Sequence, residues 1–241
     1  MWANSKRLDF RTTLEWNDRH FLLKCRWPLA VRARVASFET AFGIVQRPTH
    51  RNTSWDQAQF EVPGHRFADL SEPGYGVALL NDGRYGHHAL NNELGLSLLR
   101  SPAYPDPLAD EGDHEFTYAL FPHEGGLVDG GVLAEAEDLN RPLPAVRVQA
   151  AGAATWQPVR LEGVALGLGA LKGREDGGGL VLRLYEPQGA RGPLAVHLPE
   201  PWRVSAEADL LEEPIGPPPD RMGPFQVRTL LLEQTPPMVA R

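Results

Sequence analysis

The residues best suited to chemistry in this 241-residue sequence are polar and aromatic side chains between positions 49 and 100. Asn81, Asp82, Arg84 and Tyr85 follow one another closely, in the order Asn-Asp-Gly-Arg-Tyr-Gly. Amide, carboxylate and guanidinium groups hydrogen-bond pairs of sugar hydroxyls, and aromatic rings pack against the apolar face of a pyranose. This composition is compatible with carbohydrate recognition. The alternative is a purely structural turn, because Asn-Asp-Gly also favours a hairpin.

The spacing of ionisable residues argues against a metal centre or a complete catalytic site. His87 and His88 are adjacent, so on a strand their rings point to opposite faces and do not ligate one ion together. The other histidines lack the short spacing of metal ligands. There is no Gly-x-Ser-x-Gly elbow, no phosphate-binding glycine loop and no evident Cys/His pair. We predict no catalytic and no metal-binding residue in this chain.

The charge balance excludes two classes of partner. With a formal net charge of −7, the chain lacks a basic face to neutralise the phosphates of a nucleic acid or an anionic membrane. Arg32 and Arg34 alternate with Val31, Ala33 and Val35, which predicts a strand with both arginines on one solvated face.

Cysteine usage and the absence of targeting signals indicate a cytoplasmic setting. The one cysteine, Cys25, allows no internal disulfide and lies in an apolar run, where we expect it to be buried. No apolar run is long enough to span a bilayer. No amino-terminal segment has the pattern of a secretory signal peptide.

Period-two alternation of apolar and polar residues predicts an all-β, antiparallel sandwich. The 24 glycines and 22 prolines suit turns and strand edges better than helices. Leu8–Trp16 and His20–Trp27 are predicted to form a hairpin through the Asn17-Asp18 turn. Further strands are expected at 31–38, 42–45, 60–62, 75–80, 94–99 and 115–121, with a loop at 49–56 and a short helix at 132–139.

The pattern of predicted strands changes after Pro144, where the strands become shorter and more regular. We predict a large β-sandwich over residues 1–144 and a smaller β-sandwich over residues 145–241. The second is expected to contain strands at 146–149, 159–161, 164–171, 180–185, 194–197, 204–211 and 225–232, with a glycine-rich turn at 173–179.

Two long motifs resemble the carboxy-terminal region of family 38 glycoside hydrolases. The first reads Arg-Pro-Thr-His-Arg-Asn-Thr-Ser-Trp-Asp over 47–56 and continues as Phe-Glu-Val-Pro-Gly-His-Arg over 60–66. The second runs over 70–86, from Leu-Ser-Glu-Pro-Gly-Tyr-Gly to Arg-Tyr-Gly. Shorter matches lie at 96–102, 114–120, 182–187 and 209–214. The resemblance is narrowest to the cytosolic branch of the family's α-mannosidases and covers nearly the whole chain.

The resemblance implies a large sandwich with a mutarotase-like supersandwich fold, followed by a smaller terminal sandwich. It also implies retaining hydrolysis of α-mannosidic bonds by the whole enzyme. In this family the carboxylate nucleophile and a divalent cation, usually zinc, lie in an amino-terminal α/β barrel whose sequence is absent from these 241 residues. The chain is therefore interpreted as an excised fragment, a truncated gene product or a subunit that is not catalytic alone and holds no cofactor itself.

The resemblance further implies that sandwich residues reach the rim of the sugar pocket. Arg100 matches a substrate-contacting arginine of other family branches, although the sequence there reads Leu-Leu-Arg-Ser-Pro instead of containing a double arginine. For each candidate a structural role is the alternative. The implied substrate-binding residues are Asn81, Asp82, Arg84, Tyr85, Arg100, His50 and Trp55.

These observations predict a region that supports the catalytic barrel of its own enzyme and completes a pocket for a mannoside or oligosaccharide. One alternative is an autonomous carbohydrate-binding module that acts without the barrel. Another is a structural fragment that self-associates into homo-oligomers. A domain that docks on a barrel is expected to expose an apolar patch when alone, and an oligomer buries that patch.

Overall fold

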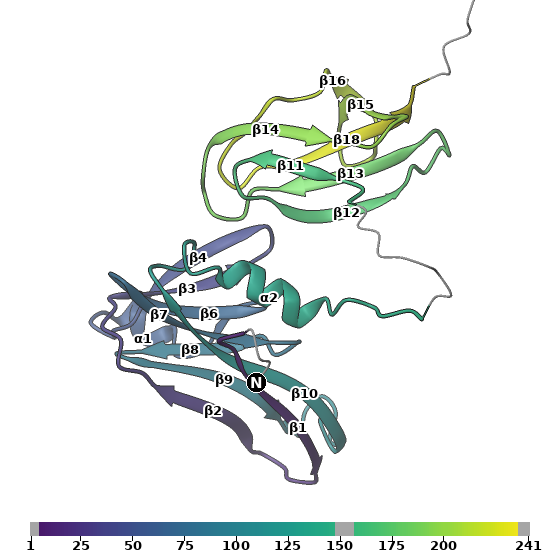
Figure 1. Cartoon of the computed structure of the whole chain (residues 1–241). Helices are drawn as coiled ribbons and strands as arrows, with labels where there is room; N and C mark the ends of the chain where they lie inside the picture. The colour runs from purple at the N-terminus through teal and green to yellow at the C-terminus, as the bar shows by residue number, and fades with distance from the viewer. Residues whose placement is uncertain (1–4, 148–156, 236–241) are drawn as a thin grey trace, which may run out of the picture. The chain divides into compact units, whose positions relative to one another are not determined.

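The computed structural model describes residues 5–147 and 157–235 and divides the chain into two compact units between Val146 and Arg147 (Figure 1). Every strand pair in the described residues is antiparallel. The predicted all-β, antiparallel architecture is therefore confirmed.

The described residues of the first unit form two sheets and two helices. The six-stranded sheet has the order β1 (Leu8–Trp16), β10 (Gly112–Glu124), β7 (Tyr75–Asn81), β6 (Phe67–Glu72), β3 (Val35–Thr40) and β4 (Gly43–Pro48). The four-stranded sheet has the order β2 (Leu22–Pro28), β9 (Glu93–Arg100), β8 (Gly86–Leu90) and β5 (Val62–Pro63). The helices are α1 (Ser54–Ala58) and α2 (Val132–Asn140).

Strand β7 is an almost unbroken apolar run because both of its faces are buried. Val77 and Leu79 join the core between the two sheets, together with Leu96 of β9. Leu80 packs on the opposite face of the six-stranded sheet with Val132 of α2. Helix α2 covers that second face (Figure 1), so the sandwich carries an additional helical layer.

The predicted hairpin between the first two strands is wrong. β1 pairs with β10 in the six-stranded sheet, whereas β2 pairs with β9 in the four-stranded sheet. The chain crosses between the sheets after Trp16, and the crossing is fixed by Ser101. The Trp16 indole donates a hydrogen bond to the Ser101 hydroxyl, and the His20 amide donates to the Ser101 carbonyl at 2.8 Å.

Two strands of the first unit escaped prediction because ionisable residues interrupt their apolar pattern. β6 contains Asp69, which is buried and lies 2.9 Å from the His123 ring. β8 contains His87 and His88, both of which are buried. A charged or titratable side chain becomes compatible with a buried strand only when a distant element supplies its partner.

Two further predictions for the first unit are corrected. The strand expected over 31–38 begins only at Val35, so Arg32 and Arg34 lie in the connection between β2 and β3. The loop expected over 49–56 ends in helix α1, which a capping box starts. In that box the Thr53 hydroxyl accepts from the Asp56 amide and the Asp56 carboxylate accepts from the Thr53 amide.

The second unit is a smaller pair of sheets. The five-stranded sheet has the order β12 (Gly167–Gly173), β13 (Leu180–Tyr185), β18 (Val227–Gln234), β15 (Trp202–Ala208) and β16 (Pro214–Gly216). The three-stranded sheet has the order β11 (Arg160–Gly163), β14 (Gly192–His197) and β17 (Arg221–Met222). Leu182, Leu184, Leu230 and Leu232 pack with Leu194 and Met222 between these sheets. The strand predicted at 146–149 extends outside the described residues.

Candidate functional site

The loop between β7 and β8 carries four of the predicted site residues. Asn81 ends β7 in the six-stranded sheet and Gly86 begins β8 in the four-stranded sheet, so the loop bridges one edge of the sandwich. Gly83 has a φ of 148°, a conformation that side chains with a Cβ rarely adopt. The Asn-Asp-Gly sequence therefore does form a turn, and the turn lies between sheets.

Asn81 holds the backbone of this loop from the interior of the protein. Its side chain is fully buried, and its oxygen accepts hydrogen bonds from the amides of Gly83 (2.9 Å) and Arg84 (2.6 Å). Its side-chain nitrogen donates to the His65 carbonyl at 2.8 Å. An amide with these partners is held inside the protein, so Asn81 positions the loop and does not present its side chain at the surface.

Asp82 presents a carboxylate at the surface of the loop. One oxygen accepts a hydrogen bond from the Thr117 amide at 2.7 Å, and the Asp82 amide donates to the Thr117 carbonyl at 3.2 Å. These two bonds hold the loop against β10. The residue remains exposed, so the second carboxylate oxygen is the chemically available group.

Arg84 is half-buried in the loop, whereas Tyr85 is exposed. The Arg84 guanidinium lies 4.5 Å from the centre of the Phe116 ring, an arrangement that fixes a cation without neutralising it. The Arg84 Nε atom is buried and has no hydrogen-bond partner among the described residues. Tyr85 is 58% exposed and meets the His65 ring edge to face, with 5.7 Å between ring centres.

Arg100 lies at the same end of the four-stranded sheet but not in contact with the loop. It ends β9, and its backbone amide donates to the Asp110 carboxylate at 2.8 Å, while its side chain is exposed. Gly86 pairs with Ser97, so Arg100 lies three residues, or about 10 Å, farther along the strand.

His50 lies at the opposite end of this sheet, so the structure does not bring it to the loop. The Asn91 amide, in the turn between β8 and β9, donates to the carbonyl of Thr49 at 2.6 Å. The His50 ring lies 3.4 Å from the Asp56 carboxylate. Trp55, on α1, is 81% exposed. The predicted site residues therefore do not form one rim, because His50 lies at the end of the sheet opposite the β7–β8 loop.

His87 is a residue of this region whose role the sequence reasoning missed. It lies beneath the loop, fully buried, with its Nε2 atom 3.4 Å from the Asn81 amide nitrogen and 3.5 Å from the His65 carbonyl. Burial lowers the pKa of His87 from 6.5 to about 4. A Cβ on Gly64 would lie 2.8 Å from this ring, so Gly64 makes room for it. The adjacency of His87 and His88 was the only signal in the sequence.

The side chains of the loop are of types that form hydrogen bonds with hydroxyl groups. A carboxylate oxygen, a guanidinium and a phenol lie within four consecutive residues on a braced turn. Among the described residues, no group of three or more His, Cys, Asp and Glu side chains is arranged to hold a metal ion. No helix in the described part of the chain is long and apolar enough to cross a membrane.

Two models of known protein families match this chain. Residues 2–108 match the family model described as the glycosyl hydrolases family 38 C-terminal domain. Residues 165–230 match the model described as the family 38 C-terminal beta sandwich domain. The chain belongs to glycoside hydrolase family 38. Within this family it corresponds to the C-terminal region, as the motifs around positions 50 and 80 predicted.

Individual relatives agree with this assignment. The chain is 44% identical over 246 aligned residues to human alpha-mannosidase 2C1, covering 95% of the chain and 23% of that protein. It is 41% identical to alpha-mannosidase G of Dictyostelium discoideum, covering 87% of the chain and 20% of that protein. The family 38 chain thus spans between a fifth and a quarter of the length of these relatives. The structure of an alpha-mannosidase from Enterococcus faecalis shares the fold, with a TM-score of 0.82 at 20% identity over 96% of this chain and 28% of that chain.

Proposed function

We propose that this family 38 chain acts as the β-sandwich region of an α-mannosidase, where it supports the catalytic barrel and contributes to the rim of the mannoside pocket. The observation that carries the proposal is the 44% identity to an α-mannosidase along nearly the whole chain. The braced loop supports the rim assignment, because the exposed Asp82 and Tyr85 and the half-buried Arg84 carry groups that suit sugar hydroxyls. Arg100 is assigned to the same rim.

The division of labour follows from the chemistry of glycoside hydrolysis. A retaining enzyme needs a carboxylate nucleophile and an acid/base partner, and the family mechanism also uses a divalent cation. We assign these groups, including a zinc ion, to the barrel. The sandwich contributes hydrogen bonds that orient the sugar, and the same proposal places the enzyme in the cytoplasm.

The test uses a polypeptide that joins this region to an α-mannosidase barrel. Asp82→Asn keeps an oxygen to accept from the Thr117 amide and removes the charge, so the fold is retained. Asp82→Asn and Arg100→Ala are made as separate variants. Each is expected to lower kcat/KM on a mannoside by about tenfold, which corresponds to the loss of one charged hydrogen bond.

Matched controls come from the exposed Lys6–Glu124 ion pair, because Glu124 ends β10 seven residues beyond Thr117 and pairs with Tyr75. Lys6→Ala and Glu124→Ala remove one positive and one negative charge away from the loop and are expected to leave kcat/KM unchanged. Unchanged kinetics in Asp82→Asn and Arg100→Ala would contradict the rim assignment.

The autonomous carbohydrate-binding module is the second candidate, and the exposed rings of Tyr85 and Trp55 favour it. Calorimetric titration of the chain alone with mannose and mannobiose separates the two functions. Saturable binding without turnover supports the module. If the chain alone binds neither sugar and activity requires the barrel, the result favours the proposal that the chain supports the catalytic barrel.

A further inference from the structure

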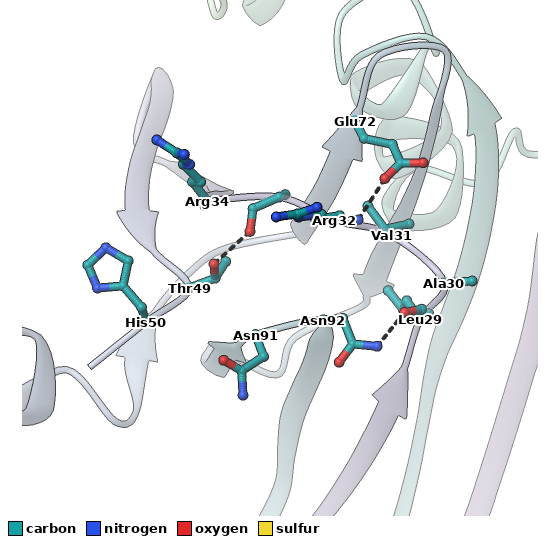
Figure 2. Close-up of a pocket in the computed structure, with 11 residues that line it drawn as sticks. Leu29, Ala30, Val31, Arg32, Arg34, Thr49, His50, Glu72, Asn91 and Asn92 are labelled. Atoms are coloured by element: carbon teal, nitrogen blue, oxygen red, sulfur yellow. Dashed lines mark hydrogen bonds between the residues drawn. The ribbon is translucent and has the colours of Figure 1, made fainter. Parts of the chain in front are cut away.

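A hollow of about 540 Å³ opens at the end of the four-stranded sheet that is remote from Arg100 (Figure 2). It is formed by the β2–β3 connection, the start of the β4–α1 segment, the β6–β7 turn and the β8–β9 turn. The β8–β9 turn precedes Glu93, and Arg100 ends the same strand, so about 25 Å separates the hollow from Arg100. The hollow is large enough for a small-molecule ligand.

Two arginines line the hollow without acidic partners. Arg32 and Arg34 are exposed, and neither side chain has a hydrogen bond or ion pair with another described residue. The nearby Glu72 carboxylate accepts from the Arg32 backbone amide at 2.7 Å (Figure 2). By contrast, Arg11 and Arg26 each pair with a carboxylate. In a chain with a net charge of −7, two unpaired guanidinium groups beside one hollow form a local positive site.

The walls of the hollow are tied to one another. The buried Thr49 donates its hydroxyl to the Ala33 carbonyl at 2.7 Å and its amide to the Arg34 carbonyl at 3.0 Å. The Asn92 side chain donates to the Leu29 carbonyl at 2.6 Å. These bonds join the β2–β3 connection to the two neighbouring walls. A ligand therefore meets a backbone that is already in place, which reduces the entropic cost of binding.

Two further polar side chains accompany the two arginines. Asn91 is exposed at the turn, and its side-chain amide has no hydrogen-bond partner among the described residues. The His50 ring, which is 45% exposed, lines the opposite wall. Guanidinium groups pair with phosphate or carboxylate oxygens, whereas an amide and an imidazole suit hydroxyl groups.

We propose that this hollow, lined by Arg32, Arg34, His50 and Asn91, binds an anionic polyhydroxyl ligand, namely a sugar that carries a phosphate or a carboxylate group. The guanidinium groups bind the anion, and Asn91 and His50 bind sugar hydroxyls. The site does not depend on the proposed pocket rim, because the two lie at opposite ends of the sheet.

The test is calorimetric titration of the chain at low ionic strength with mannose 6-phosphate, mannuronate, inorganic phosphate and mannose. Saturable binding of one of the two anionic sugars, tighter than that of phosphate or mannose, is expected. Mannose 6-phosphate and mannuronate distinguish a phosphate from a carboxylate as the preferred anion. Phosphate binding as tight as that of either sugar would overturn the polyhydroxyl part of the proposal.

The variants separate the charges from the fold. Arg32→Gln with Arg34→Gln removes only exposed side chains without partners, so the melting temperature should not change. The double variant is expected to weaken binding by about 100-fold, as for the loss of two charged hydrogen bonds. Arg11→Gln, an exposed arginine on β1, is the matched control and should bind as the parent does. No saturable binding by the parent, or equal binding by the double variant, refutes the site.

Discussion

His87 should make the stability of the first unit depend on pH. Its ring is fully buried between Phe38 and the β7–β8 loop, and burial lowers its pKa to about 4. The hydrogen bond to the His65 carbonyl opposes this shift in the pKa of His87, and electrostatic interactions with Arg47 and His88 add to it. In the unfolded chain the imidazole regains its ordinary pKa of 6.5.

The sign and size of the effect follow from proton linkage. Because the folded pKa is lower, the unfolded state takes up a proton first as the pH falls. The stabilisation is complete above pH 6.5 and is lost as the pH falls from 6.5 toward 4. Each pKa unit corresponds to about 1.4 kcal/mol, so about 2 kcal/mol is lost at pH 5 and about 3 kcal/mol after full protonation.

Comparison with His87→Gln isolates this contribution, since glutamine is polar and does not titrate. Urea unfolding is measured at pH 7 and at pH 5. Hydrogen exchange of the β8 and β9 amides serves as the probe, because these strands belong to the first unit. The stability advantage of the parent over the variant should shrink by about 2 kcal/mol at pH 5. A proton NMR titration of the His87 ring provides a second reading. A ring that titrates near 6.5, or an advantage that is equal at both pH values, refutes the reasoning.

Two further predictions concern the packing of the first unit. Leu79→Ala removes a fully buried side chain between the sheets and should lower the unfolding free energy by about 2–5 kcal/mol in urea titrations; a loss under 1 kcal/mol would contradict the core assignment. The His88 ring lies 2.8 Å from the Glu93 carboxylate. Gly95→Ala places a Cβ 2.1 Å from this ring, so it should lower the melting temperature by displacing His88 from Glu93. An unchanged melting temperature would show that the ring does not lie over Gly95.

The sequence predicted those elements whose side-chain pattern is complete within the strand itself. β7 is an apolar run, so its location needs no knowledge of the partner. β6 was missed because Asp69 breaks the run, and its partner His123 lies 54 residues later. The first hairpin was wrong for a related reason. Alternation predicts that β1 and β2 are strands, but it does not specify that Ser101 directs the chain into the other sheet.

The candidate site shows the same limit at the level of side chains. The resemblance grouped Asn81 with Asp82 because both are polar and adjacent, yet one is fully buried and the other is exposed. Residue type indicates which hydrogen bonds a side chain is able to form. Only the fold determines whether backbone groups already occupy those hydrogen bonds. For Asn81 they are occupied by the amides of Gly83 and Arg84 and by the carbonyl of His65.

The division of the predicted residues has a consequence for ligand size. His50 lies at one end of the four-stranded sheet and Arg100 at the other, about 25 Å apart along β9. A monosaccharide is far shorter than this distance, so one sugar unit does not contact both residues. A loss of mannoside turnover in Arg100→Ala together with unchanged turnover in Arg32→Gln/Arg34→Gln would therefore establish two independent surfaces. If the arginine double variant also lost turnover, a single extended oligosaccharide would have to follow the sheet from end to end.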